Sequence, residues 1–214
     1  MNSISEFERR LPQSLQPVLR SLKSPAAVQE YLDSIPYKAV ELDRSPLQVM
    51  TDGQAHCLDG GIFAALALWR IGFRPLILDL VPAPGMDDDH VLALFQMDGT
   101  WGALAKSNYP ILRYREPVYR SLRELAMTYF EFFFSLQHEK TLRAYTRPLN
   151  LSHFQDPSWM WDEQGVNKIS KRLYSLKATP LITEKSAQLL TLSDERTYKA
   201  GTYGTDFSWS FGAR

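Results

Sequence analysis

The spacing of apolar and polar residues changes along the chain, and each change predicts a different element. Short amphipathic stretches broken by prolines predict helices through the first fifty residues. The segment Cys57–Ile71 is apolar on nearly every side, which is typical of a buried helix, and Gly72 follows it as a stop signal. The early helices are expected at Glu6–Leu11, Leu15–Leu22 and Pro25–Ile35.

Strand-length apolar runs follow the buried helix. His90–Met97 and Thr100–Lys106 flank Asp98-Gly99, so they predict an antiparallel hairpin. The order of elements predicts an α+β fold in a single domain, residues 1–214, with its core at about 46–136 and the remaining helices as elaborations. The other expected elements are a strand at Pro75–Val81, a long helix from Glu116 to about Leu136, and helices at Val166–Leu176 and Pro180–Leu192.

Charge and cysteine content narrow the classes of function. The 214 residues contain 24 Lys plus Arg and 24 Asp plus Glu, which gives no electrostatic case for nucleic acid or an anionic membrane. The longest apolar run, around Leu58–Ile71, is too short to span a bilayer. The single cysteine excludes an internal disulfide framework and suits a reducing compartment, so we expect a cytoplasmic protein.

That cysteine, Cys57, is the first candidate for chemistry. It stands where a polar loop turns into the buried helix, and free amides at a helix start favour a thiolate and can hold an oxyanion. Gln54 is a candidate for an additional oxyanion donor. The competing interpretation is a small buried hydrophobe, which is the usual role of a free cysteine.

His90 is the candidate partner because it opens the predicted strand after Asp87, Asp88 and Asp89. The acidic run is expected to raise the pKa of His90 and favour an imidazolium beside the thiolate. A solvated histidine in a polar loop is the alternative.

The hairpin decides which residue orients His90. A two-residue Asp98-Gly99 turn places Ser107 opposite His90, whereas a three-residue Met97–Gly99 loop places Asn108 on the face of His90. We prefer Asn108, because an amide oxygen is the stronger acceptor for an imidazole N–H. A metal site built from His56, Cys57, Asp59 and His90 is disfavoured, because the sequence has no CxxC or HxxxH motif, and no cofactor is expected.

The stretch Pro46–Phe130 resembles the transglutaminase-like superfamily, within the papain-like thiol fold, and in particular a bacterial group of small stand-alone proteins. The pieces that carry the resemblance are QAHCLDGGIFAALALWRIGFRPLILDL and DDDHVLALFQMDGTWGALAKSNYPILRYREPVYRSLRELAMTYF, including Trp101 on the returning strand as a cleft candidate. The resemblance implies Cys57 as nucleophile and His90 as acid/base. The superfamily usually has Asp at the third position, where this chain offers Ser107 or Asn108.

A thiol hydrolase or acyltransferase with a Cys57-His90-Asn108 site is therefore the first hypothesis. The resemblance implies a thioester formed from an amide or ester group of a peptide, protein or small amide substrate. The alternative is a non-catalytic peptide- or protein-binding module on the same fold, in which Cys57 only packs. The sequence leaves the substrate, the acceptor and the oligomeric state open.

Overall fold

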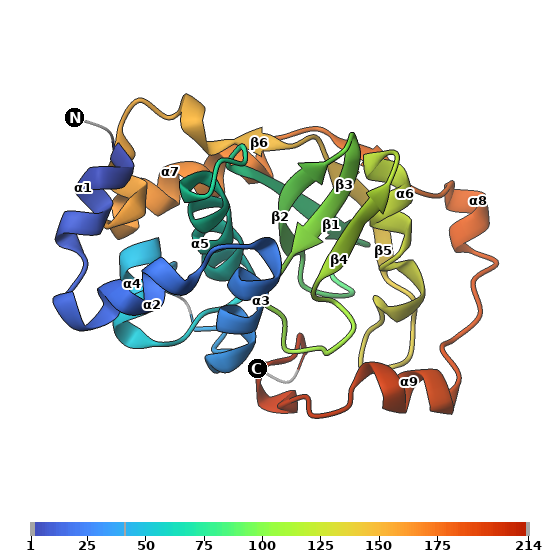
Figure 1. Cartoon of the computed structure of the whole chain (residues 1–214). Helices are drawn as coiled ribbons and strands as arrows, with labels where there is room; N and C mark the ends of the chain where they lie inside the picture. The colour runs from blue at the N-terminus through green and yellow to red at the C-terminus, as the bar shows by residue number, and fades with distance from the viewer. Residues whose placement is uncertain (1–2, 41, 213–214) are drawn as a thin grey trace.

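A computed structural model describes residues 3–40 and 42–212. Its centre is a seven-stranded antiparallel sheet in the order β4-β3-β2-β1-β5-β7, with β6 pairing with β1 (Figure 1). The strands are β1 (Leu76–Pro82), β2 (His90–Met97), β3 (Thr100–Leu104), β4 (Arg115–Tyr119), β5 (Leu142–Thr146), β6 (Leu149–Asn150) and β7 (Ala178–Pro180).

Helices cover both faces of this sheet. Helix α5 (Cys57–Arg70) packs on β1 and β2, and α6 (Leu122–Met127) packs on β3 and β4 (Figure 1). None of the described helices has the length and apolarity to cross a membrane. The remaining helices are α1 (Ser3–Arg10), α2 (Gln16–Ser21), α3 (Pro25–Ser34), α4 (Pro46–Asp52), α7 (Glu163–Tyr174), α8 (Glu184–Ala187) and α9 (Glu195–Gly201).

The structure is thus an α+β fold in which the helix that begins at Cys57 packs on an antiparallel sheet and extra helices surround it. The prediction for α5 is confirmed, because every residue from Leu58 to Leu68 is buried. Two of its glycines allow the sheet to come close. A Cβ at Gly60 would lie 2.2 Å from Cβ of Lys106, and one at Gly61 would lie 2.8 Å from Val91 Cγ1.

The strand β2 contributes its side chains to two different cores, because successive residues of a strand point to opposite faces. Val91, Ala93 and Phe95 join the core under α5 and the N-terminal helices. Leu92 and Leu94 join the second core, with Tyr129 and Phe133. In β2, odd-numbered residues therefore lie on the face that packs under α5, and even-numbered residues lie on the opposite face.

Two predicted elements differ from the structure. The expected helix from Glu116 to Leu136 is replaced by β4, α6 and a 3-10 turn at Phe130–Phe132. Pro117 fits in β4 because this strand is at the edge of the sheet, where a missing N–H costs no pairing. The expected helix at Pro180–Leu192 shrinks to α8.

Candidate functional site

Cys57 is the first residue of α5, as the sequence predicts, and it is half-buried. The preceding residue, His56, caps the helix, and its Nδ1 accepts a hydrogen bond from Leu58 N at 3.2 Å. Cys57 Sγ lies 3.7 Å from the carbonyl oxygen of Asp89, and a thiol donates to a carbonyl only while it keeps its proton. The thiol is therefore held in its neutral form.

The electrostatic surroundings of Cys57 are opposite to the expected ones. Burial raises the pKa of the thiol well above its ordinary value, and the carboxylates of Asp89, Asp79 and Asp59 raise it further. Only the backbone N–H of Val91 acts in the other direction. The prediction that the helix start and a neighbouring imidazolium lower the Cys57 pKa is therefore wrong.

His90 lies on the other face of the sheet. Its parity places it with Leu92 and Leu94, and its ring centroid is 6.5 Å from that of Tyr129 and 6.4 Å from that of Phe133. Nε2 is 2.7 Å from Leu112 O, and a carbonyl only accepts, so Nε2 carries the proton. This side of β2 faces away from α5 and from Cys57.

The buried setting of His90 also reverses its expected titration. Burial lowers the pKa of His90 to about 4, against a smaller opposing effect of its hydrogen bond to Leu112. The imidazole is neutral at neutral pH. The expectation that the acidic run raises this pKa is wrong, because burial dominates and the one charge that acts on the ring, that of Arg115, lowers the pKa further.

The third predicted member is corrected as well. Met97 pairs with Thr100, so the hairpin has the two-residue Asp98-Gly99 turn, with φ of 48° and 79°, and the three-residue loop is wrong. Asn108 exchanges hydrogen bonds with the backbone of Asp206 at 2.8 and 3.2 Å instead of orienting His90. Ser107 Oγ accepts from Tyr109 N at 3.0 Å.

The two remaining candidates differ in what the structure says of them. Trp101 pairs with Gln96 at the opposite end of β2, where it lines a different pocket, so it is not placed to hold an oxyanion at Cys57. Gln54 is three residues before Cys57, and its role as an oxyanion donor stays a prediction.

Asp89 takes the place beside Cys57 that was expected for the histidine. Odd-numbered residues of β2 face α5, and Asp89 precedes Val91 on that side. Two further side chains form hydrogen bonds with Asp89: Asp79, from β1, and Tyr174, from α7. Both hydrogen bonds lower the pKa of Asp89, but burial raises it by more. The sequence carries a signal for Asp79, because it is the one charge in the apolar run PLILDLV.

Asp79 and Asp89 share a proton. Asp79 Oδ1 and Asp89 Oδ2 are both buried, and neither has a hydrogen-bond partner among the described residues. If both carboxyl groups were ionised, these two oxygens would stay unpaired, which native structures usually avoid. Burial, and then the charge of Asp89, raises the pKa of Asp79 to about 9. A neutral Asp79 therefore donates to Asp89, and burial also raises the pKa of Asp89.

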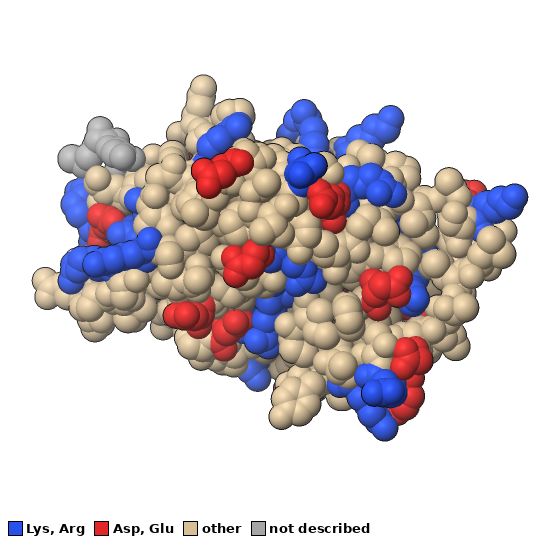
Figure 2. Space-filling view, turned by 45° about the vertical axis from the view of Figure 1, so that its right-hand side comes forward, with Lys and Arg blue, Asp and Glu red and all other residues tan. Residues whose placement is uncertain are grey.

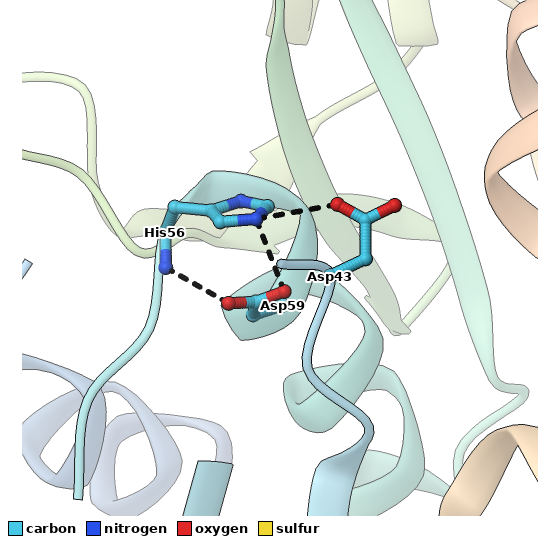
Figure 3. A group of neighbouring side chains, drawn as sticks. All are labelled: Asp43, His56 and Asp59. Carbon is cyan, nitrogen blue, oxygen red and sulfur yellow. Dashed lines mark hydrogen bonds and ion pairs between the residues drawn. The ribbon is translucent and has the colours of Figure 1, made fainter. Parts of the chain in front are cut away.

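A cluster of Asp43, His56 and Asp59 near the start of α5 has the composition of a metal site (Figure 3). His56 Nδ1 accepts from Leu58 N, so Nε2 carries the proton, and it lies 3.4 Å from Asp43 and 3.2 Å from Asp59. Asp59 also accepts from Arg44 N at 2.7 Å. Both imidazole nitrogens are occupied, so the cluster fits a cap for the helix rather than a metal ion.

A hollow of about 150 Å³ opens beside Cys57. Its lining contains carboxylates and tyrosines and no Lys or Arg, and the ring of Tyr174 is 52% exposed. The lining residues are Tyr37, Ala39, Val40, His56, Cys57, Leu58, Asp88, Asp89 and Tyr174.

No protein-family model and no curated protein matches the sequence. Among solved structures, LapG of Legionella pneumophila is similar with a TM-score of 0.44 and 11% identity, over 81% of this chain and 97% of that one. A similarity at this level assigns no activity to the chain.

Proposed function

We propose that this protein is a non-catalytic binding module that holds a basic side chain of a peptide or protein in the hollow beside Cys57. The observation that carries the proposal is that Asp89, and not His90, lines the hollow beside Cys57 and acts on its thiol. A thiol enzyme needs a base that takes the thiol proton. Here the charged groups that act on the thiol are the carboxylates of Asp89, Asp79 and Asp59, and they favour the protonated sulfur.

The lining of the hollow supports a cationic guest. The lining includes the carboxyl groups of Asp88 and Asp89, and it contains no Lys or Arg that would repel a cation. The exposed ring of Tyr174 gives the aliphatic stem of a lysine or arginine an apolar surface to contact.

The thiol-enzyme hypothesis differs from this proposal in what happens to the guest. An enzyme of that class would form a thioester at Cys57 and release an amine or alcohol, whereas the module returns its peptide unchanged. Both hypotheses place a peptide at the same end of α5. Mass spectrometry of the protein and of the peptide after incubation therefore separates them.

A labelled tetrapeptide with two central arginines and its citrulline counterpart test the binding mode. The arginine peptide should bind more tightly, should slow alkylation of Cys57 by iodoacetamide, and should lose about tenfold in affinity in Asp89→Asn. Asp98→Asn is the matched control, because Asp98 is exposed in the hairpin turn at the other end of β2 and tolerates Asn at its positive φ.

Three results would contradict the proposal: equal binding of the citrulline peptide, equal loss of affinity in both variants, or an acyl adduct on Cys57. The last result would restore the thiol-enzyme hypothesis.

A further inference from the structure

A large hollow lies at the opposite end of the sheet from Cys57. Its volume is about 570 Å³, within the range of small-molecule sites. A second hollow of about 190 Å³ shares Arg74, Leu76 and Trp101 with it. The larger one is lined by Arg74, Leu76, Trp101, Arg147, Pro148, Leu149, Asn150, His153, Phe154, Arg172 and Leu176.

Three arginines line this pocket, and no Asp or Glu does. They come from separate segments: Arg74 precedes β1, Arg147 lies between β5 and β6, and Arg172 is on α7. None of the three forms an ion pair within the described residues, and Arg172 donates only a long 3.4 Å bond to Ser175 Oγ. Figure 2 shows basic side chains gathered along its upper edge, the edge that carries β6 in Figure 1.

The three arginines place like charges around one concave surface, where they repel one another, and solvent screens this repulsion because all three side chains are exposed. The chain as a whole has no excess of basic residues, with 24 of each sign, so the concentration of positive charge is local. An anion in the pocket would relieve the repulsion.

A polar corner of the pocket adds a further donor. Asn150 Oδ1 accepts from Ser152 N and Oγ at 3.0 and 2.8 Å, which fixes the orientation of its amide. Asn150 Nδ2 then donates to His153 Nε2 at 3.2 Å, so the imidazole proton is on Nδ1. That N–H forms no hydrogen bond with the described residues and is available to an anionic ligand.

The rest of the lining consists mainly of aromatic and aliphatic side chains. Trp101 and Phe154 are partly exposed, and Leu76, Leu149 and Leu176 complete the wall. Aromatic faces stack on planar groups, and a guanidinium can do the same. The pocket thus combines several donors suited to a phosphate with surfaces suited to a ring.

We propose that this pocket binds a small phosphorylated ligand that carries a flat ring, of the mononucleotide class. Three guanidiniums and an imidazole N–H exceed what a single carboxylate needs, whereas a phosphate monoester offers two negative charges and three acceptor oxygens. The ring would lie against Trp101. The site is separate from the hollow beside Cys57, and its test does not depend on the peptide.

Isothermal titration of the full chain with AMP, adenosine and inorganic phosphate tests the proposal. AMP should bind more tightly than either fragment, and its affinity should fall as salt is raised. Arg147→Gln and Arg172→Gln should each weaken AMP binding about tenfold. Arg196→Gln, an exposed arginine on α9, should leave it unchanged. Trp101→Leu should weaken AMP but not inorganic phosphate.

The titrations test the requirement for a charged phosphate separately from the requirement for a ring. Absence of AMP binding, or equal affinity in Arg147→Gln, Arg172→Gln and the wild type, overturns the phosphate site. Equal affinity for AMP and inorganic phosphate overturns the ring. Because the three arginines are exposed, unchanged circular dichroism should accompany each arginine variant, which keeps a loss of affinity attributable to the pocket.

Discussion

At the scale of single residues, Cys57 has carboxylates within electrostatic reach and a carbonyl as its hydrogen-bond partner. The thiol donates to Asp89 O, and the carboxyl groups of Asp89 and Asp79 raise its pKa in addition to burial. A helix start normally favours a thiolate by less than 2 kcal/mol, so burial and adjacent negative charge can outweigh it. The same position in a helix therefore does not by itself make a nucleophile.

The buried His90 should make the free energy of unfolding depend on pH. Its pKa is about 4 in the folded protein against 6.5 for an ordinary histidine, so between these values only the unfolded chain binds the proton. Stability should fall as pH falls from about 6.5 to about 4, by roughly 3 kcal/mol from this residue. In His90→Gln, whose amide N–H can still donate to Leu112 O, urea unfolding should show a smaller fall over that range.

The NMR titration of His90 provides the direct check. A His90 ring resonance that titrates near pH 6.5 would show that the imidazole is solvated, and the burial assigned to it would be incorrect.

At the scale of elements, α5 is a central packing element of the fold, because it packs on β1, β2, α3 and α4. Leu66 is 1% exposed in the centre of this helix. Leu66→Ala should lower the free energy of unfolding by about 2–5 kcal/mol, through lost burial and the cavity left behind. Chemical denaturation measures the loss.

Leu189→Ala is the matched control, because Leu189 is 75% exposed and should change the unfolding free energy by less than about 0.5 kcal/mol. Similar losses in the two variants would contradict the position of α5.

The sequence predicts α5, β1 and the β2-β3 hairpin well, because their apolar runs and the Asp-Gly turn are strong local signals. The sequence cannot predict on which face of the sheet the His90 side chain lies. Val91, Leu92, Ala93, Leu94 and Phe95 are all apolar, so alternation does not reveal which side of β2 meets α5. A shift of one residue exchanges Asp89 for His90 beside Cys57, and tertiary packing decides it.

At the scale of the whole molecule, the C-terminal segment is fastened across the end of the sheet near His90. Asn108 binds the backbone of Asp206, Tyr109 Oη donates to Ser210 Oγ at 2.8 Å, and Lys38 Nζ lies 4.8 Å from the ring centre of Trp209. This explains the role of Asn108, which could not be read locally because its partner is 98 residues away.

Asn108→Ala should therefore loosen the C-terminal segment. Hydrogen exchange should rise over residues 202–212, while the rate of Cys57 alkylation should stay unchanged, because Asn108 does not act on the thiol. Asn150→Ala, an amide at the other end of the sheet, should leave exchange in that segment as it is. A change in Cys57 alkylation in Asn108→Ala would restore an orienting role for this amide.

The pH dependence of Cys57 alkylation by iodoacetamide tests the central claim most directly, because it reports whether Asp89 or His90 governs the thiol. The account predicts an apparent pKa above the ~8.5 of a free thiol, a lower value and faster alkylation in Asp89→Asn, and no change in His90→Gln. A wild-type thiol that reacts well below pH 7 and slows in His90→Gln would contradict it.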